Sequence, residues 1–269
     1  MILAQIYYSG DADEALRLAC YLADVQSEPR PDVPFLLVRK QGTPKTREDE
    51  VLDYVKPKFP HGFAIETDKT AESYVESANI LFFHVMDFVV GHFPGDAVFL
   101  YAADCLPLSR DWLRKIETEH ALARAAGKAI TGVLSGGDHF PLHINGNAVY
   151  DVDFLQKHPE GRDLPGIAPW DLYFGLSLAV PNARPTRIMQ HGWAPQGYST
   201  QDLLGFVRDG LVWCHGFKDR GGTYARARKL LLKDLSSTDV EHYELMGQRR
   251  LHGWSPEWDA MMRARMKRS

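Results

Sequence analysis

Short apolar runs alternate with amphipathic segments through the first half of this 269-residue chain. Residues 2–8 form an apolar run, residues 12–25 carry apolar side chains at helical spacing, and residues 35–38 are apolar again. Strand, helix and strand in this order predict two parallel strands joined by a right-handed crossover. The pattern therefore predicts an α/β fold with a mostly parallel central sheet flanked by helices.

The same alternation continues along the chain. Further strands are predicted at 63–65, 97–102, 129–134 and 211–214, and further helices at 51–55, 71–92, 111–126 and 199–209. Residues 97–102 are apolar throughout, which is typical of a central parallel strand buried on both faces. We expect one domain at 1–222, with a basic helical extension at 223–269 packed on it.

Composition argues against several classes of protein. Three widely spaced cysteines without a C-x-x-C pair indicate neither a disulfide framework nor a structural zinc site. No apolar run approaches the 18 residues of a membrane span, and the run at 2–8 is too short for a signal peptide. The net charge of −4 argues against nucleic-acid binding by the whole surface. We therefore expect a cytoplasmic protein with no transmembrane segment.

A carboxylate directly follows the central apolar strand. Asp104 ends the run at 97–102 and should lie in the crevice where open α/β sheets bind ligands. A hard divalent cation bound together with a diphosphate needs oxygen ligands there. The alternative is that Asp104 caps the next turn or helix, although Ser109 or Asp111 already suits that helix start.

A second polar string comes with the last predicted strand. His215 is followed by Gly216, which allows close backbone approach, and by Lys218. Imidazole suits borderline cations such as Mn²⁺, and lysine is a point charge suited to phosphate. Taken alone, the string is equally well explained by a solvated lysine after a turn.

Two histidines compete for the role of metal ligand. The His-Gly string at His191 resembles the one at His215, and we prefer His215 because Lys218 accompanies it. If Asp104 and His215 bind one cation, their coordinating atoms must lie within about 5 Å of each other.

Two amides flank a glycine at Asn145, Gly146 and Asn147. We interpret residues 143–150 as an unusually polar strand, which is costly to bury unless every polar group finds a partner. A polyhydroxylated ligand such as a sugar supplies such partners. The alternative is an Asx turn with the glycine at positive φ.

One more carboxylate precedes an apolar run. Asp171 follows Trp170 and comes before residues 172–180, so it can cap a helix. It can also act as the general base on an incoming hydroxyl, and the two roles are compatible. Asn79 is a weaker candidate for a nucleotide contact, and we interpret it as a surface residue.

Taken together, these strings resemble the GT-A glycosyltransferases. The resemblance rests on 103–108, 145–150, 170–171 and 215–219 in that order, and it covers roughly residues 2–219. It implies that Asp104 and His215 hold Mn²⁺ or Mg²⁺ and that Asp104 and Lys218 bind the donor diphosphate. It also implies that Asn145 and Asn147 face the donor sugar and that Asp171 lies at the junction of sugar and acceptor.

The sequence departs from the family pattern at one position. The first acid of the D-x-D element should fall at position 102, where this chain has Ala102. Asp104 alone remains, so the resemblance implies either weaker metal binding or a metal-independent variant.

The resemblance implies transfer of a sugar from a nucleotide-diphosphate donor, expected to be UDP-linked, to an acceptor hydroxyl. One alternative is a non-catalytic protein that binds sugar nucleotides or glycans and lost turnover with the acid at Ala102. A sugar-phosphate nucleotidyltransferase usually has a glycine-rich basic loop after the first strand. Here the turn at 8–14 is acidic and would repel a triphosphate, which disfavours that alternative.

The C-terminal residues offer the only indication of an acceptor. Residues 249–268 are rich in Lys and Arg, with Trp254 and Trp258 at helical spacing. They indicate either a terminal helix docked through its tryptophans or a surface for a polyanionic acceptor. Such acceptors include a modified nucleic acid, an anionic glycan, and a lipid-linked acceptor on a membrane.

Overall fold

The computed structural model describes residues 1–232 except 9, 44, 46, 138–139, 163–167, 218 and 220–221. Its largest sheet has seven strands in the order β10-β6-β9-β4-β1-β2-β3. These strands are β1 (Ile2–Ile6), β2 (Phe35–Arg39), β3 (Gly62–Glu66), β4 (Ala97–Ala102), β6 (Ile130–Gly132), β9 (Ala148–Asp151) and β10 (Ala183–Pro185). Neighbouring strands run parallel except at β9, which is antiparallel to both β4 and β6. The predicted mostly parallel central sheet is confirmed.

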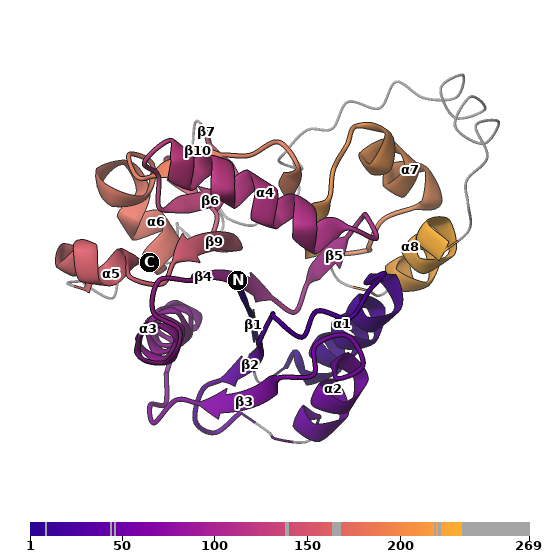
Figure 1. Cartoon of the computed structure of the whole chain (residues 1–269), viewed down its shortest axis with the longest axis horizontal. Helices are drawn as coiled ribbons and strands as arrows, with labels where there is room; N and C mark the ends of the chain where they lie inside the picture. The colour runs from indigo at the N-terminus through magenta and orange to yellow at the C-terminus, as the bar shows by residue number, and fades with distance from the viewer. Residues whose placement is uncertain are drawn as a thin grey trace.

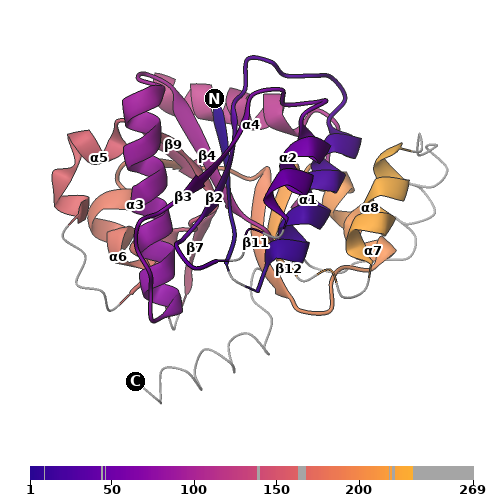
Figure 2. The same ribbon diagram turned by 90° about the horizontal axis from the view of Figure 1, so that it is seen from below.

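Helices cover both faces of this sheet. They are α1 (Ala12–Val25), α2 (Glu48–Val55), α3 (Tyr74–His92), α4 (Trp112–Ala125), α5 (Phe154–Lys157), α6 (Trp170–Phe174), α7 (Thr200–Arg208) and α8 (Thr223–Leu232), with the short turns η1 (Pro159–Arg162) and η2 (Gly175–Ala179). Helix α3 lies on the opposite side of the sheet from α1 and α2 (Figures 1 and 2). None of the helices in the described part of the chain is long and apolar enough to span a membrane.

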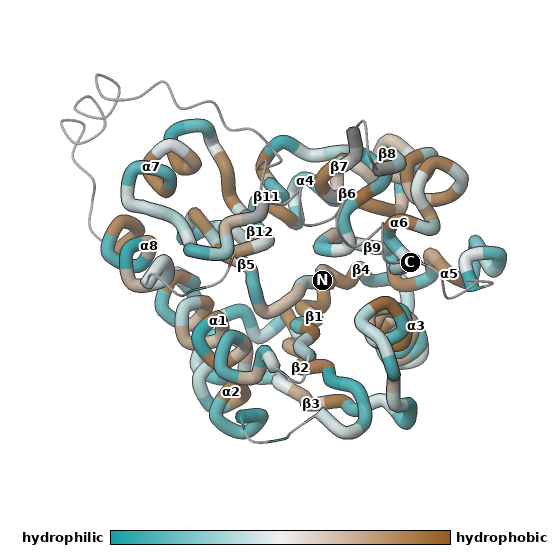
Figure 3. Tube along the Cα trace, turned by 180° about the vertical axis from the view of Figure 1, so that it is seen from behind, coloured by the Kyte–Doolittle hydropathy of each residue, from teal (hydrophilic) through white to brown (hydrophobic). Residues whose placement is uncertain are grey.

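The pleat of β4 explains why the sheet has two cores. Phe99 and Tyr101 pack with α1 and α4, whereas Val98 and Leu100 pack with α3. Successive strand residues point to opposite faces, so a strand covered on both faces has to be apolar throughout. Figure 3 shows hydrophobic residues along β1 and β4, in the middle of the molecule.

A second, three-stranded sheet adjoins the first. It contains β5 (Cys105–Pro107), β11 (Met189–Ala194) and β12 (Trp213–Phe217), with β12 in the middle. β12 is parallel to β11 and antiparallel to β5. The strand predicted at 211–214 begins later and extends farther, to Phe217. Strand β11 was not predicted from the sequence.

A hairpin and a turn replace the polar strand predicted at 143–150. β7 (Leu134–Gly137) pairs with β8 (Phe140–Ile144), and β9 begins only at Ala148. Between them Asn145 Oδ1 accepts a hydrogen bond from the Asn147 backbone N–H at 3.0 Å, which is an Asx turn. The prediction of one strand was wrong because the asparagine side chain competes with a neighbouring strand for that N–H. The alternative of an Asx turn is confirmed, although Gly146 is not at positive φ.

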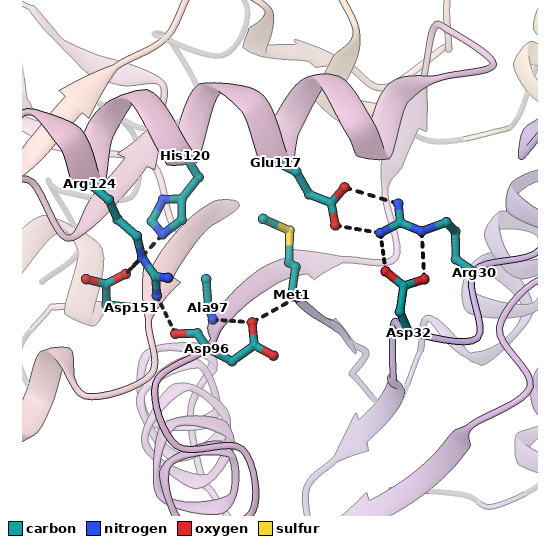
Figure 4. Close-up of polar contacts among 9 residues, drawn as sticks. All are labelled: Met1, Arg30, Asp32, Asp96, Ala97, Glu117, His120, Arg124 and Asp151. Atoms are coloured by element: carbon teal, nitrogen blue, oxygen red, sulfur yellow. Dashed lines mark hydrogen bonds and ion pairs between the residues drawn. The ribbon is translucent and has the colours of Figure 1, made fainter.

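Polar side chains of α4 and β9 contact one another near the amino end of β4 (Figure 4). His120 Nε2 lies 3.1 Å from Asp151 Oδ1, and its Nδ1 lies 3.0 Å from Thr131 Oγ1. Arg124 Nε donates to the same Asp151 oxygen at 2.5 Å. These contacts attach α4 to β6 and β9.

The predicted C-terminal extension begins with α8. Tyr224 and Ala227 of this helix belong to the core on the α1 side of the sheet. Figure 1 shows α8 beside α1, with α7 on the same side of the molecule. Residues 233–269, including Trp254 and Trp258, lie outside the described residues.

Candidate functional site

Asp104 lies between the two sheets, after β4 ends and before β5 begins. The side-chain amide of Asn147 forms hydrogen bonds with residues on both sides of it. Asn147 Oδ1 accepts from the Ala102 N–H at 2.7 Å and from the Cys105 thiol at 3.2 Å. Asn147, which the sequence analysis placed against the donor sugar, therefore has a structural role in shaping the Asp104 loop.

Two later segments of the chain complete this frame. The Gly216 N–H donates to the carbonyl of Asp104 at 3.0 Å. The Tyr224 hydroxyl, from α8, donates to the carbonyl of Cys105 at 2.9 Å. Because three segments distant in sequence hold this short loop, the direction of the Asp104 side chain is set by tertiary contacts.

Strand β12 brings a histidine to this carboxylate. His215 Nε2 lies 3.1 Å from Asp104 Oδ1, well within the ~5 Å expected of two ligands of one cation. Its other ring nitrogen, Nδ1, lies 2.8 Å from Nδ1 of His191 in β11. Burial lowers the pKa of His191 to about 3, and His215 adds to this effect, so His191 is uncharged at neutral pH. The two histidines considered as alternatives thus lie together.

A glycine makes the contact between the two histidines possible. In the parallel register of β11 and β12, His191 is the partner of His215. The next residue, Gly216, has φ +97°, and a Cβ there would lie 1.8 Å from the carbonyl oxygen of Gly192. The close backbone approach that the sequence analysis expected at Gly216 occurs here, and no side chain would fit.

A second carboxylate lies in the first turn of α6. Asp171 Oδ2 accepts from the Gly146 N–H at 3.1 Å, and Oδ1 accepts from the Leu172 N–H at 3.0 Å. Asp171 is not the helix cap, because the helix begins before it. Instead Asn79 Oδ1 accepts from the Trp170 N–H at 2.7 Å. The interpretation of Asn79 as a surface residue was wrong: it is only 8% exposed and fixes the start of α6.

The environment of Asp171 favours proton uptake. Burial raises its pKa above the ordinary value, although nearby His143 and the hydrogen bonds from Leu172 and Gly146 oppose the shift. His143 Nδ1 lies 2.8 Å from the Pro141 carbonyl, so this nitrogen carries the hydrogen. A carboxylate of raised pKa is a stronger base than a solvated one.

A tyrosine lies at the same edge of the sheet as Asp104. Ile6 pairs with Ala102 across β1 and β4, so Tyr8 and Asp104 each lie two residues beyond the paired strand ends. Burial raises the pKa of the Tyr8 hydroxyl, and Tyr74, Asp104 and Asp171 raise it further. The Tyr8 hydroxyl therefore keeps its proton at neutral pH.

Neither Tyr8 nor Tyr74 was predicted from the sequence to be a site residue. The rings of Tyr8 and Tyr74 are 5.3 Å apart between centroids, and Tyr74 is 62% exposed. The position of Tyr8 just beyond the first strand was the available signal, because ligands bind at that edge.

Asp104 and His215 together provide a donor set suited to a divalent cation. A carboxylate oxygen and an imidazole nitrogen suit Mn²⁺, and their spacing suits one ion. Position 102 adds no side-chain ligand, since it is Ala102. Across the described residues, no group of three or more His, Cys, Asp or Glu is placed to hold a metal. Lys218 lies outside the described residues.

No protein-family model and no curated protein matches the sequence. Solved structures do match. A structure of the galactosyltransferase LgtC with donor and acceptor sugar analogues has a TM-score of 0.53 and 9% identity, covering 88% of this chain and 98% of LgtC. A structure of an active-site mutant of LgtC has a TM-score of 0.52 and 11% identity, covering 90% of this chain and 100% of LgtC. The chain has the fold of the GT-A glycosyltransferases, as the resemblance implied.

Proposed function

From the GT-A glycosyltransferase fold of this chain, we propose that it transfers a hexose or pentose from a nucleotide-diphosphate sugar to an acceptor hydroxyl. UDP is the nucleotide we expect. The observation that carries the proposal is the contact between Asp104 and His215, 3.1 Å apart, just beyond the carboxyl end of β4, where α/β sheets bind ligands. The Asp104 backbone carbonyl accepts a hydrogen bond from the Gly216 N–H, and the Asp171 carboxylate accepts one from the Gly146 N–H.

Asp104 and His215 are the residues that would hold Mn²⁺ or Mg²⁺ in this proposal. Such an ion, when bound, neutralises charge that develops on a leaving diphosphate. The Asn147 side chain accepts from the Ala102 N–H, and the Gly216 N–H donates to the Asp104 carbonyl. These bonds orient the Asp104 loop before any ligand arrives, which lowers the cost of binding. Lys218 remains our proposed phosphate contact.

Asp171 is the proposed general base. The acceptor hydroxyl would give its proton to a carboxylate oxygen of Asp171 as the oxygen attacks the donor sugar. The Gly146 and Leu172 N–H groups fix the carboxylate, and its raised pKa favours proton uptake. This role requires inversion at the sugar carbon, so the stereochemistry of the product tests it.

Of the two amides, Asn145 is the better candidate for a donor contact. Asn147 is engaged with the Asp104 loop and with Asn145 Oδ1. The Nδ2 group of Asn145, by contrast, makes no hydrogen bond with any residue in the described part of the chain.

One observation favours a second candidate function. Ala102 offers no ligand where the family pattern has an acid, and its N–H is already engaged by Asn147. A protein that binds sugar nucleotides without turnover would tolerate this change.

A panel of UDP- and GDP-linked sugars, each with and without Mn²⁺, separates these functions. We expect release of free nucleoside diphosphate, stimulated by Mn²⁺, with one or a few donors. Binding without release would support the non-catalytic alternative. The matched control is Asp171→Asn, which should keep donor binding. Neither binding nor release with any donor would contradict both functions.

A further inference from the structure

His215 contacts two other side chains through its two ring nitrogens. Its Nε2 lies 3.1 Å from Asp104 Oδ1, and its Nδ1 lies 2.8 Å from His191 Nδ1. Two ring nitrogens at this distance share one hydrogen, so one of them donates and the other accepts. The direction of this bond depends on what His215 Nε2 binds.

Binding a cation at Nε2 determines that direction. A metal takes the Nε2 lone pair, which leaves the hydrogen of the neutral His215 ring on Nδ1. His191 Nδ1 must then accept it. In the neutral, metal-free pair either ring can donate across the Nδ1–Nδ1 contact, because each imidazole can carry its hydrogen on either nitrogen. An imidazole suits both states because its Nδ1 either donates or accepts, depending on the tautomer.

We propose that His191 is the positioning residue of the cation site, accepting the hydrogen on His215 Nδ1 so that Nε2 faces the cation beside Asp104. The inference rests on the proposed function, since it needs a cation at Asp104 and His215. Histidines that bind metals generally donate their second N–H to such a partner, and losing the partner weakens metal binding.

The fold shows that this contact is built into the backbone. The residues are register partners in β11 and β12, and the strands approach so closely at Gly216 that a Cβ would overlap the Gly192 carbonyl. The ring planes are inclined by 32° with centroids 4.8 Å apart. Because Ala102 stands in place of a second acid, the orientation of each remaining ligand has a larger effect on the affinity for the cation.

Three substitutions at one position test the proposal. His191→Leu removes the acceptor, His191→Asn puts an amide near the place of Nδ1, and His191→Gln moves the amide toward the place of Nε2. We expect His191→Leu to weaken Mn²⁺ binding about 10- to 100-fold, measured by electron paramagnetic resonance. His191→Asn should restore most of the affinity and His191→Gln much less. Wild-type affinity in His191→Leu would overturn the proposal.

A spectroscopic readout covers the case in which the variants fold poorly. In wild-type protein labelled with ¹⁵N-histidine and loaded with diamagnetic Mg²⁺ or Zn²⁺, we expect hydrogen on Nδ1 of His215 and none on Nδ1 of His191. The reverse arrangement would overturn the role of His191. If the wild type binds none of these cations, the cation site itself fails, and the role of His191 fails with it. If His191→Leu binds the cation as tightly as wild type, only the role of His191 is contradicted, and the proposed function is not.

Discussion

The two ends of strand β4 carry the same pair of side chains with different surroundings. At the amino end His120 Nε2 lies 3.1 Å from Asp151, and at the carboxyl end His215 Nε2 lies 3.1 Å from Asp104. Distance alone therefore does not separate a structural histidine–aspartate pair from a candidate ligand site.

The remaining partners make the difference. At the amino end Arg124 donates to the same Asp151 oxygen (Figure 4). The second nitrogen of His120 bonds to Thr131, so helix and sheet are joined. At the carboxyl end the second nitrogen of His215 meets another imidazole, which can donate or accept. The Arg124 guanidinium is permanently charged and occupies the place of a cation beside Asp151, whereas His191 is uncharged at neutral pH. We therefore expect the amino-end pair to stabilise the fold and the carboxyl-end pair to accept a cation.

The largest expected effect is at the carboxyl end, in Asp171→Asn. Asn keeps the shape of the side chain and can still accept from the Gly146 N–H, but it cannot take a proton. We expect the transfer rate to fall by about 10²–10⁴. The melting temperature should stay nearly constant, as measured by calorimetry. A fully active variant would remove the catalytic role of Asp171.

The second-largest expected effect is a loss of turnover when the histidine at the carboxyl end of β4 is replaced, compared with the histidine at the amino end. His215→Ala should reduce metal-stimulated donor turnover by about 10- to 1,000-fold, because it removes a group that stabilises a charged leaving group. Asp104→Ala should be at least as damaging. The control is His120→Ala, whose turnover per folded molecule should stay near wild type. Equal losses of turnover in His215→Ala and His120→Ala would mean that the two ends of β4 do not differ in function.

A smaller effect, on stability, is expected at the amino end. Asp151→Asn removes the charged partner of Arg124 and His120, which should lower the free energy of unfolding by about 1–3 kcal/mol. Urea titration measures this change, and donor turnover serves as the control. A stable but inactive Asp151→Asn variant would mean that the amino end takes part in the reaction.

The smallest expected effect is the pH dependence of the difference in unfolding free energy between wild type and Asp151→Asn. Burial raises the pKa of Asp151, but hydrogen bonds from His120 and Arg124 outweigh it and hold the pKa below the ordinary value. A lowered folded-state pKa stabilises the protein above the ordinary carboxyl pKa of ~3.9, and this contribution disappears as pH falls through the folded-state value. The advantage of wild type over Asp151→Asn should therefore shrink below about pH 4. Unfolding curves between pH 7 and pH 3 measure it, and a difference that grows in acid would contradict the assignment.

The sequence alone determined the elements whose signal is local. The predicted bounds 12–25 and 97–102 are those of α1 and β4. A helix with one buried face shows its period within its own residues, and a strand buried on both faces has to be apolar throughout. For the same reason, the position of Asp104 beyond the strand end could be predicted.

The tertiary structure alone decided which polar groups meet. Strand β11 gave no clear local signal, so the pairing of His191 with His215 was not foreseen. The amides at Asn145 and Asn147 looked like ligand contacts, yet Asn147 holds the Asp104 loop and Asn79 holds the start of α6. A polar side chain bonds to whatever the fold places within about 3 Å, and that neighbour comes from a distant part of the chain.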